Sequence, residues 1–222
     1  MSSNYNNLKN WISNSQLIVS EPYNENYGGV YSFYDENEKK YSFLDPEITG
    51  YSASTLSFLH EISPDSKLDN LAKANTAWLI KIFQKFDSIV QGISSDKKRQ
   101  KFAYTFDAAI CAKGLLDYYK INKSSELLDA AKSLLTWIAP AINNDGTVLP
   151  YKNLELNNFE EDSDVWYKKK GNLHIKISIP FVQMYELTKD ESFLNIAKKL
   201  CNTYTKYVQR DGSLSMLSLI HI

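Results

Sequence analysis

An internal repeat is the feature that most constrains how this chain of 222 residues can fold. Three Ala-Lys pairs, beginning at Ala72, Ala131 and Ala197, can be aligned without gaps over the residues that precede them. Seven residues before each alanine stands a residue that favours a helix N-cap: Asp65, Ser124 and Asp190. Self-similarity at this period is typical of folds built from repeated helical units, so we expect each copy to form the same unit.

Each repeat unit is long enough for two helices and a loop, because the aligned alanines lie roughly 60 residues apart. The helix predicted from Asp65 carries its apolar residues on one side, as expected of a helix that packs by one face. The helix predicted over 106–119 is apolar nearly all round, which indicates burial on every side. Turns at Asp145-Gly146 and Asp211-Gly212 end the second and third units. The pattern predicts hairpins that pair an inner helix with an outer one.

Alternating inner and outer helices predict an all-α fold, the α/α toroid, in which the inner helices surround an axis and start at the same end. The long loops 13–44, 86–104 and 147–173 precede those starts. Trp11-Ile12 matches the tail of an outer helix, so the sequence contains three hairpins and a stub. We therefore expect one domain over residues 1–222 that forms about half of a ring.

Charge and apolar patterning exclude several classes of function. The 25 basic and 26 acidic residues nearly balance, and the longest basic block, 96–101, is too short for a nucleic-acid footprint. Neither a secretory signal nor a membrane span is recognisable. Cys111 and Cys201 lie far apart in apolar stretches, without His or Cys at metal-ligand spacing. We expect a soluble, cytoplasmic protein with two buried free thiols, no metal and no cofactor.

The repeat alignment brings three chemically active residues to the starts of the inner helices. Glu47, Asp107 and His174 stand at nearly the same distance before the aligned alanines, so they are expected to face one cavity. Two carboxyls and an imidazole suit general acid–base work on a sugar. A carboxylate at a helix start also satisfies free amides, and a lone histidine often has a structural role. Pro180 leaves open whether His174 lies in the helix or in the preceding loop.

Aromatic residues are abundant, with 15 Tyr, 10 Phe and 4 Trp, and many stand in the loops before the inner helices. Flat rings beside acids suit stacking and hydrogen bonding to sugars, although long loops also need such rings to pack on themselves. The predicted substrate contacts are Asp45, Tyr51, Trp166 and Tyr27.

The repeat core at 187–190 and 197–198, the Asp-Gly turns, and helix starts such as 47–51 and 106–107 resemble the six-hairpin α/α-toroid proteins. These include glycosidase-like, polysaccharide-lyase-like and terpenoid-cyclase-like proteins. The resemblance implies a carbohydrate-active protein, a glycan hydrolase, lyase or epimerase of polysaccharide metabolism. A non-catalytic glycan-binding or scaffold toroid of polysaccharide biosynthesis is the alternative. Expected partners are a glycan or another small molecule, with neither nucleic acid nor membrane, and the oligomeric state stays open.

The last six residues, 217–222, resemble the translation of an adapter used in sequencing libraries. We therefore expect this segment to be non-native and the natural chain to continue beyond it.

Overall fold

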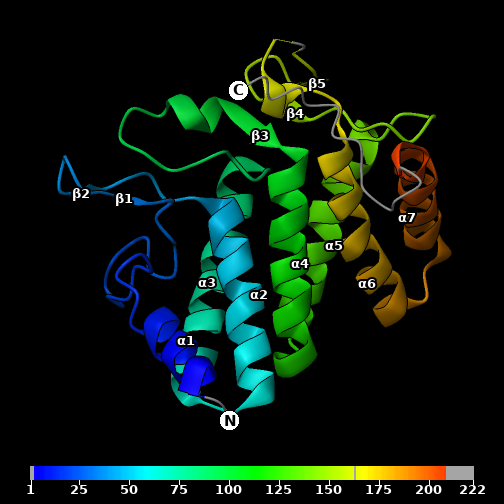
Figure 1. Ribbon diagram of the computed structural model, residues 1–222. Helices are drawn as coiled ribbons and strands as arrows, with labels where there is room; N and C mark the ends of the chain where they lie inside the picture. The colour runs from blue at the N-terminus through cyan, green and yellow to red at the C-terminus, as the bar shows by residue number, and fades with distance from the viewer. Residues whose placement is uncertain (1–2, 163, 209–222) are drawn as a thin grey trace.

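A computed structural model describes residues 3–162 and 164–208 of the chain (Figure 1). The described residues form a short helix followed by three helical hairpins. The helices are α1 (Ser3–Ser13), α2 (Pro46–Ile62), α3 (Ser66–Phe86), α4 (Thr105–Asn122), α5 (Ser125–Ile138), α6 (Ser178–Thr188) and α7 (Glu191–Tyr204). The expectations for residues 217–222 and for the turn at 211–212 concern residues outside this described part.

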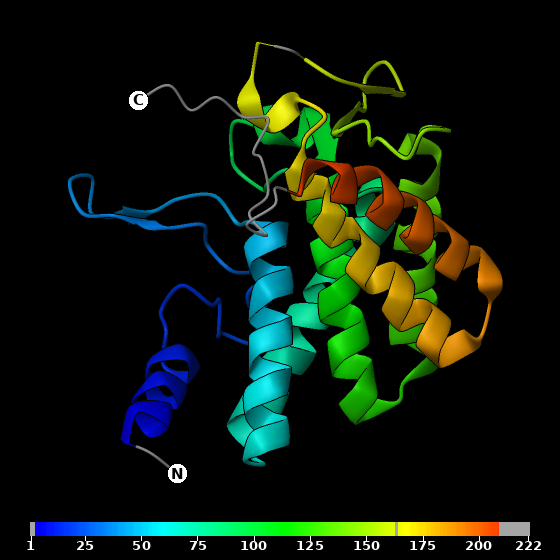
Figure 2. The same ribbon diagram turned by 45° about the vertical axis from the view of Figure 1, so that its right-hand side comes forward.

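The helices form two layers. Helices α2, α4 and α6 lie side by side and start at the same end, with α4 in the middle, and α3, α5 and α7 pack behind them (Figures 1 and 2). The core fills the space between the layers with side chains such as Leu56, Trp78, Leu115 and Phe181. The predicted arrangement of inner and outer helices in an α/α toroid is confirmed.

Local sequence explains why each hairpin turns where it does. Asp65 caps α3 by accepting hydrogen bonds from the amides of Lys67 and Leu68, and Asp190 caps α7 by accepting one from the amide of Ser192. Ser124 occupies the N-cap of α5 without a side-chain hydrogen bond. Lys123 and Lys189, which end α4 and α6, take the left-handed conformation that stops a helix. The inner and outer helices of these two hairpins are therefore joined by tight turns.

Two glycines set how closely α2 and α4 approach. A Cβ atom on Gly50 would lie 2.9 Å from the carbonyl oxygen of Ile110, and one on Gly114 would lie 2.6 Å from the carbonyl oxygen of Gly50. The backbones of the two inner helices thus meet where neither residue has a side chain. This close approach holds the N-terminal ends of α2 and α4 side by side.

Short strands shape the loops at the start of the inner helices. Strands β1 (Tyr34–Asp35) and β2 (Lys40–Tyr41) form an antiparallel hairpin. A second antiparallel sheet, in the order β3-β4-β5, lies at the N-terminal end of α4 and consists of β3 (Phe102–Tyr104), β4 (Tyr151–Asn153) and β5 (Asn158–Glu160) (Figure 1). The short helical turns are η1 (Lys98–Lys101), η2 (Ala139–Ala141), η3 (Trp166–Lys168), η4 (Asn172–Ile177) and η5 (Thr205–Tyr207).

The two cysteines are free, as expected, but only Cys111 is fully buried. Cys201 is half-buried, because it lies on the outer helix α7 rather than between the layers. No helix in the described part of the chain combines the length and the apolar composition that crossing a bilayer would require.

Candidate active site

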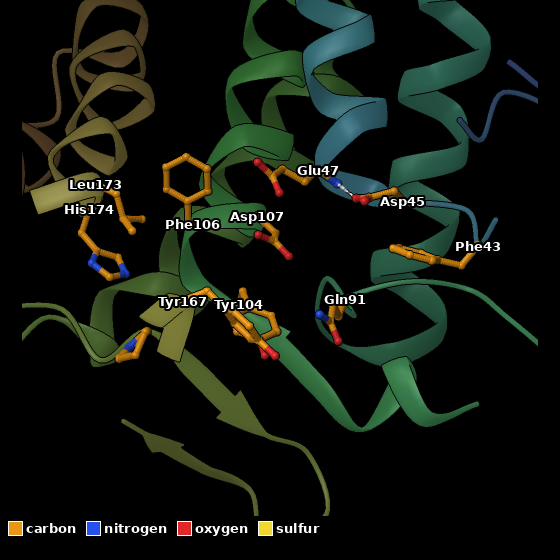
Figure 3. A pocket seen from close by; sticks show the side chains of 11 residues that line it. Phe43, Asp45, Glu47, Gln91, Tyr104, Phe106, Asp107, Tyr167, Leu173 and His174 are labelled. Carbon is orange, nitrogen blue, oxygen red and sulfur yellow. Dashed lines mark hydrogen bonds between the residues drawn. The ribbon is translucent and has the colours of Figure 1, made fainter. Parts of the chain in front are cut away.

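A cavity of about 360 Å³ opens where the inner helices begin. The start of α2, the start of α4 and the turn η4 that leads into α6 lie around it, together with β3, η3 and nearby loop residues (Figure 3). Its lining consists of Phe43, Asp45, Glu47, Gln91, Tyr104, Phe106, Asp107, Pro150, Tyr167, Leu173 and His174. The three residues that the repeat alignment placed at one level therefore line one cavity.

The start of α2 supplies two of the carboxyls. Asp45 is the N-cap residue, and its Oδ1 accepts hydrogen bonds from the amides of Glu47 at 3.0 Å and Ile48 at 3.3 Å. Its backbone amide donates to the carbonyl of Val30 at 2.8 Å, which ties the preceding loop to the helix. This cap fixes the first turn so that the Glu47 side chain enters the cavity.

Asp107 comes from the first turn of α4 and is buried to 9% exposure. The hydroxyl of Thr105 donates to the carbonyl oxygens of Leu149 and Pro150, so the start of α4 is fastened to the segment before β4. In Figure 3 the carboxyl groups of Glu47 and Asp107 lie in the centre of the view, with His174 on one side and Phe43 and Gln91 on the other.

Burial and like charge keep these carboxyls protonated to unusually high pH. Burial raises the pKa of Glu47 to about 7, and the charge of Asp45 adds to the effect, while the positive charge of Lys176 opposes it. Burial, and then the charges of Glu47 and Asp45, raise the pKa of Asp107 well above its ordinary value. Since neighbouring buried carboxylates cannot all ionise, Glu47 and Asp107 titrate as a pair that retains a proton near neutral pH.

His174 presents a neutral imidazole to the same cavity. It lies in η4 and is 1% exposed, and α6 begins only at Ser178, so the histidine precedes the helix rather than standing in its first turn. Burial lowers its pKa to about 4. Nδ1 lies 2.9 Å from the carbonyl oxygen of Gly171 and 3.3 Å from the amide nitrogen of the same residue, so it could donate to the first or accept from the second. We assign the ring proton to Nδ1 because the contact with the carbonyl oxygen is the shorter. Nε2 then carries the free electron pair and can accept a proton.

Aromatic rings form the rest of the wall. The rings of Tyr104 and Tyr167 lie 5.9 Å apart, and burial raises the pKa of Tyr104, so its phenol stays protonated. Phe43 is covered by the guanidinium of Arg99 at 3.8 Å from the ring centre. The pairing of Leu44 with Ile93 holds Phe43 and Gln91 at the edge of the cavity. An acid-containing cavity with an aromatic wall is suited to a hydroxyl-rich ring.

The predicted substrate contacts are placed differently. Asp45 lines the cavity, but Tyr51 lies one turn further along α2 and lines a second cavity with Lys113 and Asp117. Burial, and then the charges of Glu47 and Asp107, raise the pKa of Tyr51, so the two carboxyls still act on its phenol electrostatically. Tyr27 lines neither of these two cavities, because its loop runs along the outer helix α3, where the backbone of Gly28 packs on Ala74.

Trp166 lies in η3, and its side chain is outside what the structure describes. Its neighbour Tyr167 lines the cavity. Tyr104 and Phe106 also line the cavity, and they were not predicted from the sequence as lining residues. They stand on either side of Thr105, the first residue of α4, just before Asp107. Their position next to Asp107 in the sequence was the one feature from which they could have been predicted. Within the described residues, no group of three or more His, Cys, Asp or Glu side chains could hold a metal ion.

Inner helices that start around one acid-lined cavity, with outer helices packed behind them, define an α/α toroid of the glycosidase-like class. Within that class, the chain belongs to the family described as Beta-L-arabinofuranosidase, GH127 catalytic domain, whose model matches residues 4–216. No curated protein matches the sequence.

Solved structures share the fold at low sequence identity. A cellobiose 2-epimerase from Bacillus thermoamylovorans matches with a TM-score of 0.73 and 15% identity, over 97% of this chain and 59% of its own. A GH76 α-mannanase from Bacteroides thetaiotaomicron matches with a TM-score of 0.65 and 18% identity, over 79% of this chain and 48% of its own. A D-mannose isomerase matches with a TM-score of 0.64 and 15% identity, over 80% and 49%. The chain thus spans about half the length of the solved structures it matches.

Proposed function

We propose that this chain is the acid–base half of a carbohydrate-active enzyme, and that it acts on a glycan by hydrolysis of a glycosidic bond. One observation carries the proposal: one cavity at the starts of the inner helices collects a carboxyl pair with raised pKa values, a neutral imidazole and an aromatic wall. Membership of an arabinofuranosidase family and likeness to a mannanase, an epimerase and an isomerase support the same class of substrate. The domain is proposed to be single over the whole chain.

The proposed reaction assigns each group one role. The protonated member of the Glu47 and Asp107 pair donates its proton to the glycosidic oxygen as the carbon–oxygen bond breaks. Water attacks the sugar carbon and gives a proton to Nε2 of His174. The imidazolium then returns that proton to the carboxylate pair, which restores the starting state. Tyr104, Tyr167 and Phe106 hold the sugar ring against the acids.

A non-catalytic glycan-binding or scaffold toroid is the rival proposal, and the aromatic wall would serve it equally well. The raised pKa values favour catalysis, because a proton held near neutral pH is what a general acid requires and what binding alone does not.

Turnover of aryl glycosides by Glu47→Gln and Asp107→Asn variants separates the two proposals. Removing a general acid is expected to lower kcat by roughly 10²- to 10⁴-fold for substrates with poor leaving groups. The loss should be smaller for activated leaving groups, which need less protonation. Glu126→Gln is the matched control, since Glu126 is also the second residue of its helix but is exposed on the outer helix α5.

Full turnover by the Glu47 and Asp107 variants would contradict the acid–base assignment. Glycan binding without turnover by any variant, the unmodified chain included, would favour the scaffold.

A further inference from the structure

A further hollow of the surface, distinct from both cavities described above, lies between α1 and the β1–β2 hairpin. It measures about 1020 Å³, nearly three times the volume of the acid-lined cavity at about 360 Å³, and the two share no lining residue. Figures 1 and 2 both show the hairpin projecting on the same side of the molecule as α1, away from η4 and α6. We call this hollow the α1–hairpin groove. It is a separate surface, and the reaction proposed above does not use it.

Exposed aromatic rings stand on both sides of the α1–hairpin groove. Trp11, from the last turns of α1, is 66% exposed, and Tyr34, from β1, is 38% exposed. Exposed rings that line one hollow can stack on the flat apolar face of a ligand. Both sides of the groove therefore offer a flat apolar face to a ligand.

The hairpin side of the groove is held in place before any ligand arrives. The ring of Tyr41 stacks on Tyr31 with centroids 4.8 Å apart and meets the edge of Tyr34 at 5.1 Å. Its hydroxyl donates to Oε1 of Gln16 at 2.9 Å, which links the hairpin to the segment after α1. Because these contacts fix the rings, binding costs little further loss of side-chain freedom.

The polar groups of the groove suit a neutral, hydroxyl-rich ligand. Glu36 and Lys39 are its charged lining residues, and they pair with each other at 2.9 Å. An anionic or cationic ligand would find no unmatched charge among the lining residues that the structure describes. Asn14 also lines the groove, and two hydrogen bonds orient its side-chain amide. Its Oδ1 accepts from the ammonium of Lys67 at 2.6 Å, and its Nδ2 donates to the backbone carbonyl of Asn10 at 2.7 Å. Amides beside exposed rings are the partners that sugar hydroxyls and sugar faces require.

We propose that the α1–hairpin groove binds a neutral polysaccharide chain at a site distinct from the acid-lined cavity. The assignment of the ligand class rests on the proposed function. The volume of the groove admits several sugar units, whereas the cavity admits fewer, so the groove would hold a long chain while the cavity acts on one bond.

Affinity electrophoresis in gels that contain a soluble neutral arabinan or mannan tests the proposal. We expect both Trp11→Ala and Tyr34→Ala to weaken retardation by roughly 5- to 10-fold, as loss of one aromatic contact predicts. The two residues lie on separate elements and are exposed, so the variants should fold. Tyr23→Ala is the matched control, because Tyr23 is fully exposed and lies outside the groove.

Equal retardation of the unmodified chain and both groove variants would overturn the proposal. So would a concentration-dependent dimer that Trp11→Ala abolishes in light scattering, since the groove would then bind a second copy of the chain. Retardation by charged polygalacturonate alone would also overturn it. A different result would contradict the proposed function, namely a Glu47→Gln variant with unchanged turnover.

Discussion

Glu47 is a proposed general acid, and the surroundings that raise its pKa also lower the stability of the folded chain at high pH. Its ordinary pKa of 4.5 rises to about 7, with burial as the main cause. Between these two values the folded state binds a proton that the unfolded state has already released. The unfolding free energy therefore falls as the pH rises through this range and stays low above it.

The Glu47→Gln variant should therefore be more stable than the unmodified chain at pH 8, by roughly 1–3 kcal/mol, because the amide is not penalised for a buried charge. Urea unfolding at pH 5 and at pH 8 measures this directly. The gain should shrink at pH 5, where the carboxyl is protonated in the folded state. Glu126→Gln should change stability by less than about 0.5 kcal/mol at either pH. A variant that is less stable at pH 8 would contradict the burial of this carboxyl.

At this scale the repeat alignment predicted the right neighbours for Glu47, Asp107 and His174, because helix starts of equivalent units lie on one rim. It was less informative about Tyr51 and Tyr27. Tyr51 stands four residues after Glu47, and one helical turn along α2 carries a side chain about 6 Å deeper, into the second cavity. Tyr27 belongs to an irregular loop, whose path no periodicity describes.

At the scale of elements, the crossing of α2 and α4 depends on residues that have no side chain. Gly50 and Gly114 lie where the two backbones touch, and the close approach brings Glu47 and Asp107 to the same cavity. Helix propensity alone would favour alanine over glycine in a helix by about 1 kcal/mol. For a substitution of either glycine by alanine, packing therefore predicts a loss of stability and helix propensity predicts a gain.

We expect Gly114→Ala to destabilise the fold by about 1–3 kcal/mol, because its Cβ would overlap the carbonyl oxygen of Gly50 and force the helices apart. Urea denaturation measures the change. Gly171→Ala serves as the control, since a Cβ there would approach nothing closer than 4.0 Å and its backbone is extended. An alanine at 114 that stabilises the chain would show that the two helices do not meet at these glycines.

The helices could be predicted from caps and apolar spacing, since Asp65, Ser124 and Asp190 each mark an outer helix that the structure contains. The strands β1 to β5 could not, because two or three residues are too few to show an alternating pattern. Their positions depend on pairings such as that of Tyr104 with Tyr151, which are far apart in the sequence.

At the scale of the whole molecule, a polar network joins the three inner helices. The ammonium of Lys113 on α4 donates to the hydroxyl of Ser54 on α2 at 3.2 Å and pairs with Asp117 one turn further along α4. Asp117 in turn accepts a hydrogen bond from Nε2 of Gln183 on α6 at 2.7 Å. Burial alone would raise the pKa of Asp117, but the hydrogen bond and charge of Lys113, together with hydrogen bonds from Ser54 and Gln183, lower it overall.

Replacing Asp117 with Asn should destabilise the molecule by about 1–3 kcal/mol at pH 7, because Lys113 loses its charged partner in a half-buried site. The lowered pKa means that this stability is present above the unfolded pKa and is lost as the pH falls through the folded one. The difference between the variant and the unmodified chain should therefore narrow in acid. Thermal unfolding from pH 7 to pH 3 measures both effects. Asp129→Asn on the exposed face of α5 is the control, and an equal loss there would contradict the network.

The pH dependence of kcat on an aryl glycoside, for the unmodified chain and for Asp45→Asn, tests most directly whether the carboxyls at the inner helix starts form one acid–base site. We expect activity to fall as the pH rises past about 7, where Glu47 loses its proton. In Asp45→Asn, which keeps a side-chain oxygen to cap α2, the activity should fall at a lower pH, because the neighbouring charge that adds to the raised pKa of Glu47 is removed. An alkaline limb that stays at the same pH in the variant, or a profile without such a limb, would contradict the shared site.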